Sequence, residues 1–220
     1  MTNAIALFAK VPIAGAVKTR LQPRLTAQQS AELHAALAAD VWKTLGELPH
    51  AERWLFSDGA DARFEELAKD RLRRQSSGGL GTRMLRCFEQ LAAEGYGRIL
   101  IVGADSPTLP PAYLRMGFEL LNQVDAILGP TEDGGYYAVG CRAPHPEMFR
   151  GVEWSSERAF EQTEAAFERA GLSMARLPVW YDIDRYEDLQ RLAAEPCIPE
   201  NTLRWLETSP LSGSLARESP

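Results

Sequence analysis

Residues Arg98 to Pro110 read RILIVGADSPTLP and contain the feature that decides the fold. The run from Ile99 to Gly103 is apolar and rich in isoleucine and valine, which predicts a strand buried on both faces. The Ser-Pro pair after Asp105 stops this strand. Ligands of open α/β sheets bind beyond the carboxyl ends of the strands. We therefore expect Asp105 to lie in a binding site whose other groups come from the rest of the chain.

Apolar strand-length runs alternate with amphipathic helical segments along the chain. Strands are expected at 4–9, 53–57, 72–75, 99–103, 124–129, 134–141 and 174–181, and helices at 27–48, 62–69, 82–94, 111–122, 157–170 and from about 185. This alternation predicts parallel strands with helices on both faces. The segment 134–141 follows its neighbour by only a turn, so it is expected to run antiparallel. We predict an α/β protein, a single-domain three-layer α/β/α sandwich with a mostly parallel, mixed sheet over residues 1–207, followed by a flexible tail over 208–220.

The composition is that of a globular protein, with 220 residues of which 45% are hydrophobic and 25% charged. No apolar run approaches the roughly 18 residues of a membrane span, and the N-terminus lacks the features of a signal peptide. Cys87, Cys141 and Cys197 are widely spaced, which predicts reduced thiols in a cytoplasmic protein. The net charge of −6 argues against nucleic-acid binding. The sequence gives no indication of the oligomeric state.

Positive charge is concentrated in the loop after the first expected strand, where no acidic residue precedes Glu32. Lys10, Lys18 and Arg20 are candidates to pair with the phosphates of a nucleotide, and Gly15 would let the backbone approach them. The string GAVKT does not complete a P-loop, which requires GxxxxGK[ST]. The alternative interpretation is a surface loop with solvated cations.

A second candidate for nucleotide binding is SSGGLGTRM at 76–84, a glycine-rich turn before a helix. Helix N-termini bind anions through their free backbone N–H groups. Gly79, Gly81 and Arg83 are therefore candidates to contact the base, ribose or phosphate. The alternative is that the glycines serve only the geometry of the turn.

Aspartates at expected strand ends are candidates to hold a divalent cation. Asp105, with Asp182 and Asp184 from the segment YDIDRYEDL, would offer the hard oxygen ligands that suit Mg²⁺ or Mn²⁺. Alternation would place Asp182 and Asp184 on one face if the preceding strand extends that far. The alternatives are that Asp105 caps the turn that follows it, and that Asp184 caps the helix beginning near Arg185.

The segment TEDGGYYAVG at 131–140 is a further acidic turn, here with adjacent glycines. Asp133 is a candidate to orient or deprotonate an acceptor hydroxyl. Gly134 and Gly135 would allow the acceptor to approach closely, and Tyr136 or Tyr137 would stack on a sugar or base. The alternative is a hairpin turn with packed tyrosines. The absence of GxSxG leaves a hydrolase triad without support.

Six segments occur in order and together identify a resemblance: FAKVPIAGAVKTRL, GGLGTRM, ILIVGADSPTLP, LGPTEDGGYYAVG, VEWSSE and YDIDRYEDL. The combination resembles a bacterial family of glycosyltransferase-like proteins with the GT-A, or nucleotide-diphospho-sugar transferase, fold, and some members are associated with arsenosugar biosynthesis. The resemblance covers roughly residues 4–195. It extends more distantly to molybdenum cofactor guanylyltransferases and phospholactate guanylyltransferases. In those proteins the aspartate after a central strand holds a metal, as Asp105 would here, and a late aspartate can supply a second ligand. Their late segment usually contains Thr-Pro, where this chain has Arg185-Tyr186.

The resemblance implies a metal-dependent glycosyltransferase that uses a nucleotide-sugar donor and a small-molecule acceptor. Lys18, Arg20 and Arg83 would hold the phosphates and base region. Asp105, through Mg²⁺ or Mn²⁺, would neutralise the departing nucleoside diphosphate, and Asp133 would face the acceptor. One alternative is a nucleotidyltransferase that transfers a nucleoside monophosphate from an NTP and releases pyrophosphate. The other is a nucleotide-binding module without turnover. For an enzyme, we expect Asp105→Ala to abolish turnover and leave the fold intact.

Overall fold

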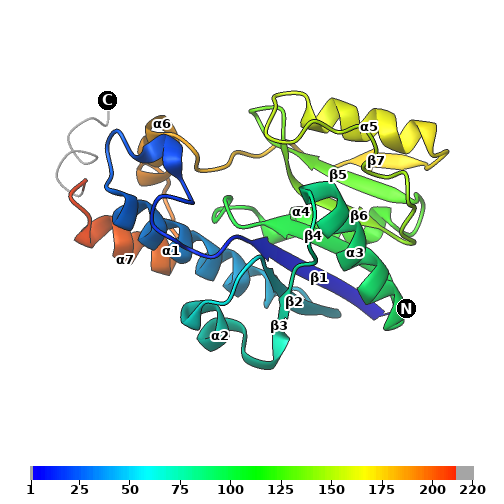
Figure 1. The fold of residues 1–220 in the computed structure, drawn as a ribbon, viewed down its shortest axis with the longest axis horizontal. Helices are drawn as coiled ribbons and strands as arrows, with labels where there is room; N and C mark the ends of the chain where they lie inside the picture. The colour runs from blue at the N-terminus through cyan, green and yellow to red at the C-terminus, as the bar shows by residue number, and fades with distance from the viewer. Residues whose placement is uncertain (1, 212–220) are drawn as a thin grey trace.

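The structure is a computed structural model that describes residues 2–211, and its centre is a seven-stranded sheet (Figure 1). The strand order is β3-β2-β1-β4-β6-β5-β7. The strands are β1 (Thr2–Ala9), β2 (Ala51–Ser57), β3 (Leu72–Arg74), β4 (Tyr96–Gly103), β5 (Ala126–Pro130), β6 (Tyr136–Cys141) and β7 (Met174–Arg176). Only β6 pairs antiparallel to its neighbours, which confirms the mixed sheet predicted from the short turn before it. All other strands therefore end at one edge of the sheet, and β6 begins there.

The central strand β4 is buried on both sides, as its unbroken apolar run predicts. Leu100 and Val102 pack into the core on one face of the sheet, while Ile99 and Ile101 pack on the other. None of these four side chains is more than 3% exposed. Burial of this kind contributes about 25 cal/mol for each Å² of apolar surface removed from water, so it strongly favours the sheet.

Helices cover both faces of the sheet and confirm the three-layer α/β/α sandwich. The cores assign α1 (Ala27–Leu45), α2 (Ala62–Ala68) and α4 (Pro111–Leu120) to one face, and α3 (Leu80–Ala93) and α5 (Ala159–Arg169) to the other. Thr26 begins α1 with a capping box in which its hydroxyl accepts the N–H of Gln29 and the Gln29 side chain accepts the N–H of Thr26. Two 3-10 turns, η1 (Thr19–Leu21) and η2 (Lys69–Arg71), complete the elements of the first half.

A third apolar cluster lies beyond the main sheet, at the left of Figure 1. It joins the loop after β1 and the first half of α1 to α6 (Tyr186–Ala193) and α7 (Glu200–Thr208). Asp40 of α1 fixes α7 by accepting the backbone N–H groups of Asn201 and Thr202 at 3.0 and 2.7 Å. This cluster ties the C-terminal helices to the loop that holds the predicted phosphate-binding residues.

The domain continues past the boundary expected at residue 207. Helix α7 extends to Thr208, and Ser209 and Leu211 are buried against it and its neighbours. The rest of the expected tail, residues 212–220, lies outside the described residues. Cys87 and Cys141 are buried, Cys197 is exposed, and all three are free thiols. Within residues 2–211, no helix combines the length and apolarity that crossing a membrane requires.

Candidate functional site

The carboxyl edge of the sheet brings together a lysine and an aspartate that are far apart in sequence. Lys18 follows β1 and Asp105 follows β4, and these strands are neighbours in the sheet. The Lys18 Nζ atom lies 2.5 Å from Asp105 Oδ1 and 3.1 Å from Asp184 Oδ1. It also donates to the carbonyl oxygen of Ile183 at 2.5 Å. The structure thus brings together two residues that were expected to serve one nucleotide site, and their direct contact is a finding of the structure.

The Lys18 side chain is only 3% exposed, whereas that of Asp105 is 41% exposed. The contact between them is nevertheless buried, because Asp105 Oδ1 is fully enclosed and the exposure of Asp105 lies on its other side-chain atoms. Burial raises the pKa of Asp105, but Lys18 and His34 outweigh it and hold this pKa well below 3.8. Burial lowers the pKa of Lys18, and Asp105 and Asp184 raise it above 10.5 overall. Both groups are therefore charged at neutral pH.

Asp184 does not cap α6, contrary to one of the alternatives drawn from the sequence. Residue Arg185 occupies the N-cap position, and the Asp188 carboxylate accepts the backbone N–H groups of Asp184 and Arg185 at 2.9 and 2.6 Å. This bonding leaves the Asp184 side chain free to turn toward the loop after β1. There its Oδ2 atom accepts a hydrogen bond from Arg20 Nη1 at 2.9 Å.

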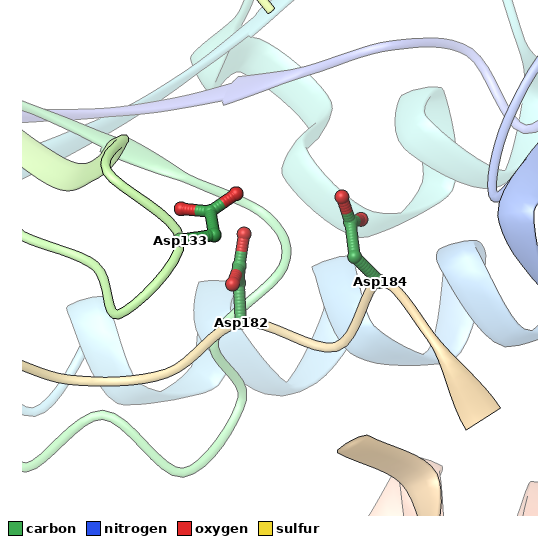
Figure 2. Close-up of side chains that lie close together, drawn as sticks. All are labelled: Asp133, Asp182 and Asp184. Atoms are coloured by element: carbon green, nitrogen blue, oxygen red, sulfur yellow. The ribbon is translucent and has the colours of Figure 1, made fainter. Parts of the chain in front are cut away.

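Three carboxylates gather beside this ion-pair cluster. Figure 2 shows Asp182 and Asp184 on the segment before α6, with Asp133 facing Asp182 from the turn between β5 and β6. One oxygen from each of the three carboxylates lies within 4.8 Å of the others. The strand β7 ends at Arg176, so Asp182 and Asp184 approach each other along an extended segment rather than the expected strand.

Asp182 is the carboxylate most affected by this crowding. Burial is the first cause that raises its pKa, and the negative charges of Asp133, Asp184 and Asp105 add to it, so that its pKa rises from 3.8 to about 7. Among the described residues Asp182 has no ion pair within 4 Å, whereas Asp184 has two. Asp182 therefore lies in a strongly negative and incompletely neutralised environment.

The donor set suits a hard divalent cation. Asp105, Asp133, Asp182 and Asp184 would carry four negative charges, and Lys18 and Arg20 two positive charges, which leaves a formal charge of −2. Carboxylate oxygens are the ligands that Mg²⁺ and Mn²⁺ prefer in proteins. Asp133, Asp182 and Asp184 could hold such an ion together. Asp133 thus joins the predicted ligands, and Asp105 is linked to them through Lys18.

The turn that carries Asp133 is fixed by its own hydrogen bonds. Asp133 Oδ1 accepts the Thr131 hydroxyl at 2.6 Å and the Gly135 N–H at 3.0 Å. Gly134 has φ +85°, and its carbonyl oxygen accepts the N–H of Phe160. A Cβ atom at Gly134 would collide with the carbonyl oxygen of Glu157. These glycines therefore shape the turn and its packing, and the role in acceptor approach predicted from the sequence stays a prediction.

A Gly134→Ala variant is expected to lose about 2 kcal/mol of stability, because both the positive φ and the collision with Glu157 oppose the new side chain. The matched control is Gly95→Ala, since Gly95 has φ +94° but no heavy atom within 4 Å of the added Cβ. The control should lose only about 1 kcal/mol. Urea unfolding of both variants measures the difference, and equal losses would show that the segment around Glu157 yields freely.

The second predicted nucleotide-binding segment begins α3 at the same edge of the sheet. Arg83 Nη1 donates to Gln75 Oε1 at 2.5 Å, and Gln75 Nε2 in turn donates to the carbonyl oxygens of Ala9 and Phe56. Gly79 is the exposed N-cap of α3, with open space around it. Gly81 is instead buried, and an added Cβ would collide with Phe149 and Trp154. The absence of a side chain at Gly81 thus serves packing, while Gly79 keeps the position that a ligand contact requires.

The remaining predicted residues divide into exposed and buried ones. Lys10, Gly15 and Arg20 are exposed on the loop after β1, and Gly15 has φ +84°. The hydroxyl oxygen of Tyr136 is buried and its ring, on a half-buried residue, packs edge-on against Trp154, so its stacking on an acceptor stays a prediction. The hairpin alternative with packed tyrosines describes this position better.

Two polar residues at the site were missed in the sequence. His34 is buried on α1, where Nε2 donates to the Lys10 carbonyl oxygen at 3.0 Å and Nδ1 lies 3.6 Å from Asp105 Oδ1. Gln75 is buried at the end of β3 and positions Arg83. The sequence signal that could have revealed His34 is its position within the apolar stripe of α1, next to Leu33 and Leu37.

Comparison with known proteins places the chain in a family. The bacterial family DUF2064, described as an uncharacterized protein conserved in bacteria, matches residues 41–156. That segment includes β4, Asp105 and the turn with Asp133. None of the curated proteins compared with the chain matches its sequence.

Solved structures show the same fold over nearly the whole chain. A protein from Desulfovibrio desulfuricans G20, provisionally named a nucleotide-diphospho-sugar transferase, is 30% identical, with a TM-score of 0.80 over 99% of this chain and 95% of its own. A cytidylyltransferase from Leptospira borgpetersenii is 14% identical, with a TM-score of 0.60 over 100% and 98%. The inositol-1-phosphate CTP transferase from T. maritima is 13% identical, with a TM-score of 0.55 over 94% and 97%. The chain is thus a member of the bacterial DUF2064 family and has the nucleotide-diphospho-sugar transferase fold.

Proposed function

We propose that this protein is a metal-dependent glycosyltransferase that uses a nucleotide-sugar donor. The observation that carries the proposal is the gathering of Asp133, Asp182 and Asp184 within 4.8 Å, next to the Lys18–Asp105 ion pair, at the carboxyl edge of the sheet. That edge is where ligands of open α/β sheets bind. The relative from Desulfovibrio desulfuricans G20, 30% identical to this chain, carries a matching name.

The residues have separable roles in this proposal. Lys10, Gly15 and Arg20 on the exposed loop after β1, with Gly79 and Arg83 at the start of α3, would bind the nucleotide phosphates and base region. Asp133, Asp182 and Asp184 would hold Mg²⁺ or Mn²⁺, which would supply positive charge toward the departing nucleoside diphosphate.

Asp105 and Asp133 would have different roles in the transfer. Asp105 fixes Lys18 and the backbone around Ile183, whose N–H donates to the Asp105 carbonyl oxygen at 2.9 Å, so it keeps the two edge segments together. Asp133 is exposed on its turn, which lets it orient the hydroxyl of a small-molecule acceptor. The reaction would break the bond between the sugar and the diphosphate and form one between the sugar and that hydroxyl.

The second candidate is a nucleotidyltransferase. The cytidylyltransferase from Leptospira borgpetersenii shares the fold over the whole chain, although at 14% identity that likeness concerns the fold alone. The same edge would then support attack on the α-phosphate of an NTP, with pyrophosphate leaving.

Product analysis tests the proposal. The protein is incubated with a panel of nucleotide-sugars or of NTPs, with Mn²⁺ or with EDTA, and released nucleoside diphosphate and pyrophosphate are measured. We expect release of nucleoside diphosphate from a nucleotide-sugar that requires Mn²⁺. Asp182→Asn should abolish the release, while Asp70→Asn, which changes an exposed aspartate on η2, should leave it unchanged.

Each other outcome identifies a different function. Release of pyrophosphate from an NTP would establish nucleotidyl transfer instead. Nucleotide binding that needs no metal and is equal in the parent and Asp182→Asn, with no product from any donor, would indicate a binding module without turnover.

A further inference from the structure

Lys18 is held in a way that leaves it nothing to offer an incoming phosphate. An ammonium group has three N–H donors. Lys18 Nζ donates to Asp184 Oδ1 at 3.1 Å and to the Ile183 carbonyl oxygen at 2.5 Å, it forms an ion pair with Asp105 Oδ1 at 2.5 Å, and the side chain is 3% exposed. The lysine predicted to grip a nucleotide is therefore fully engaged with the acidic side of the site.

The backbone keeps Lys18 in this position. Its φ of 49° and ψ of 39° lie in the left-handed region, which a residue with a side chain adopts at a cost of about 1 kcal/mol or more. Val17 before it is 5% exposed, and Leu21, one turn later, is fully buried in the third apolar cluster. The packed loop thus turns the ammonium inward, away from solvent.

Arg20 adds a second cation to the same carboxylates. Its Nη1 atom donates to Asp184 Oδ2 at 2.9 Å, so each oxygen of Asp184 faces one positive side chain. Asp184 is also one of the three aspartates whose oxygens come within 4.8 Å of one another (Figure 2). A carboxylate of the proposed metal site is therefore already neutralised by two side chains of the protein.

We propose that Lys18 and Arg20 are built-in counter-ions, which hold Asp184 and Asp105 until a divalent cation takes Asp184 and frees the Lys18 ammonium for the substrate phosphates. This inference rests on the metal site of the proposed function and specifies how that site is regulated. Lys18 and the divalent cation compete for Asp184, so the lysine weakens binding of the ion in the absence of substrate. The Lys18 ammonium and the divalent cation are both positive, and such charges repel strongly at a separation of a few ångströms even at an effective dielectric constant near 20. By linkage, binding of the ion must equally weaken the contact between Lys18 and Asp184.

Titration of the full-length protein with Mn²⁺ alone tests the proposal, with the free ion followed by electron paramagnetic resonance. Lys18→Met removes the charge but keeps an apolar stem, and we expect it to bind Mn²⁺ about tenfold more tightly than the parent. Arg20→Gln, whose side chain is exposed, should bind about threefold more tightly, because water screens its charge.

The chain offers a matched control for the arginine. Arg142 Nη2 lies 2.8 Å from Asp125 Oδ1, with exposures of 45% and 36%, close to the 51% and 31% of Arg20 and Asp184. Asp125 lies just before β5, at the opposite edge of the sheet. Arg142→Gln should leave the Mn²⁺ affinity unchanged, which separates a local counter-ion effect from a change in net charge.

The outcomes distinguish this proposal from the metal site itself. Binding that is lost in Asp182→Asn but is equal or weaker in Lys18→Met and Arg20→Gln would establish the metal site and overturn the counter-ion role. Equal Mn²⁺ binding by the parent and Asp182→Asn would remove the metal site and this inference with it. If Lys18→Met fails to fold, Arg20→Gln against Arg142→Gln decides the question alone. A larger rise in melting temperature on adding Mn²⁺ to Lys18→Met than to the parent would support the proposal independently.

Discussion

An Asp105→Ala variant is expected to be less stable than the parent by about 3 kcal/mol, in addition to losing turnover. The reason is that Lys18, at 3% exposure, would keep its charge but lose its closest partner. Removing one member of a buried ion pair leaves an uncompensated charge, which costs about 3–5 kcal/mol. We take the lower end because Asp184 and the Ile183 carbonyl oxygen would still accept from Lys18.

Guanidinium unfolding at pH 7 in EDTA measures this loss, and a double-mutant cycle with Lys18→Met assigns it. Removing both partners leaves no unpaired charge, so the double variant should recover part of the stability that Asp105→Ala loses. Strictly additive losses would show that the two side chains do not depend on each other. The stability that Asp105 contributes requires its ionised form, whose pKa in the folded protein is well below 3.8. It is therefore present above pH 3.8 and is lost as the pH falls toward the folded-state value.

This expectation corrects the one drawn from the sequence, in which Asp105→Ala leaves the fold intact. A lysine in a loop with glycine and proline is typical of an exposed phosphate contact. Its burial depends on α6 and α7, which close over the loop through the third apolar cluster. Lys18 and Ile183 are 165 residues apart, and no local pattern predicts such a contact.

The regular elements were predictable from local sequence because burial imposes a period on them. The apolar run of β4 and the short turn before β6 each act within a few residues, and the structure confirms the strand and the antiparallel pairing that they predict. They fix the sheet edge and hence the position of Asp105.

The packing that local sequence did not reveal depends on contacts between distant elements. Gly81 faces Phe149 and Trp154, and Tyr136 packs edge-on against the same tryptophan, so both contribute to packing under α3. The alternative in which Asp184 caps α6 is also wrong for this reason, since Arg185 occupies the N-cap position. Asp184 is drawn away by Lys18 and Arg20, which lie before α1.

An Asp182→Asn variant should have the opposite effect on stability from Asp105→Ala, although both remove a carboxylate from one site. In EDTA at pH 8 we expect Asp182→Asn to be more stable than the parent by about 2 kcal/mol. Asp182 has no cationic partner within 4 Å among the described residues, and its ionised form is opposed by burial and by Asp133, Asp184 and Asp105. Removing the charge relieves that repulsion. Affinity for Mn²⁺ should fall about 100-fold, since the ion would lose a charged ligand.

The pKa shift of Asp182 determines how the stability difference between Asp182→Asn and the parent depends on pH. The pKa of Asp182 rises from 3.8 to about 7 on folding, so its ionisation opposes folding. Below pH 3.8 the carboxyl is protonated in both the folded and the unfolded chain, and the two proteins should unfold alike. The stability advantage of Asp182→Asn over the parent should grow between pH 3.8 and 7 and remain constant above pH 7.

At pH 8, saturating Mn²⁺ should reverse the order of stability, because the ion stabilises only the protein that binds it. A variant that is less stable than the parent in EDTA at pH 8 would show that Asp182 serves the fold. If Asp182→Asn is instead the more stable protein in EDTA, the Asp182 carboxylate destabilises the metal-free protein and serves to bind a divalent cation.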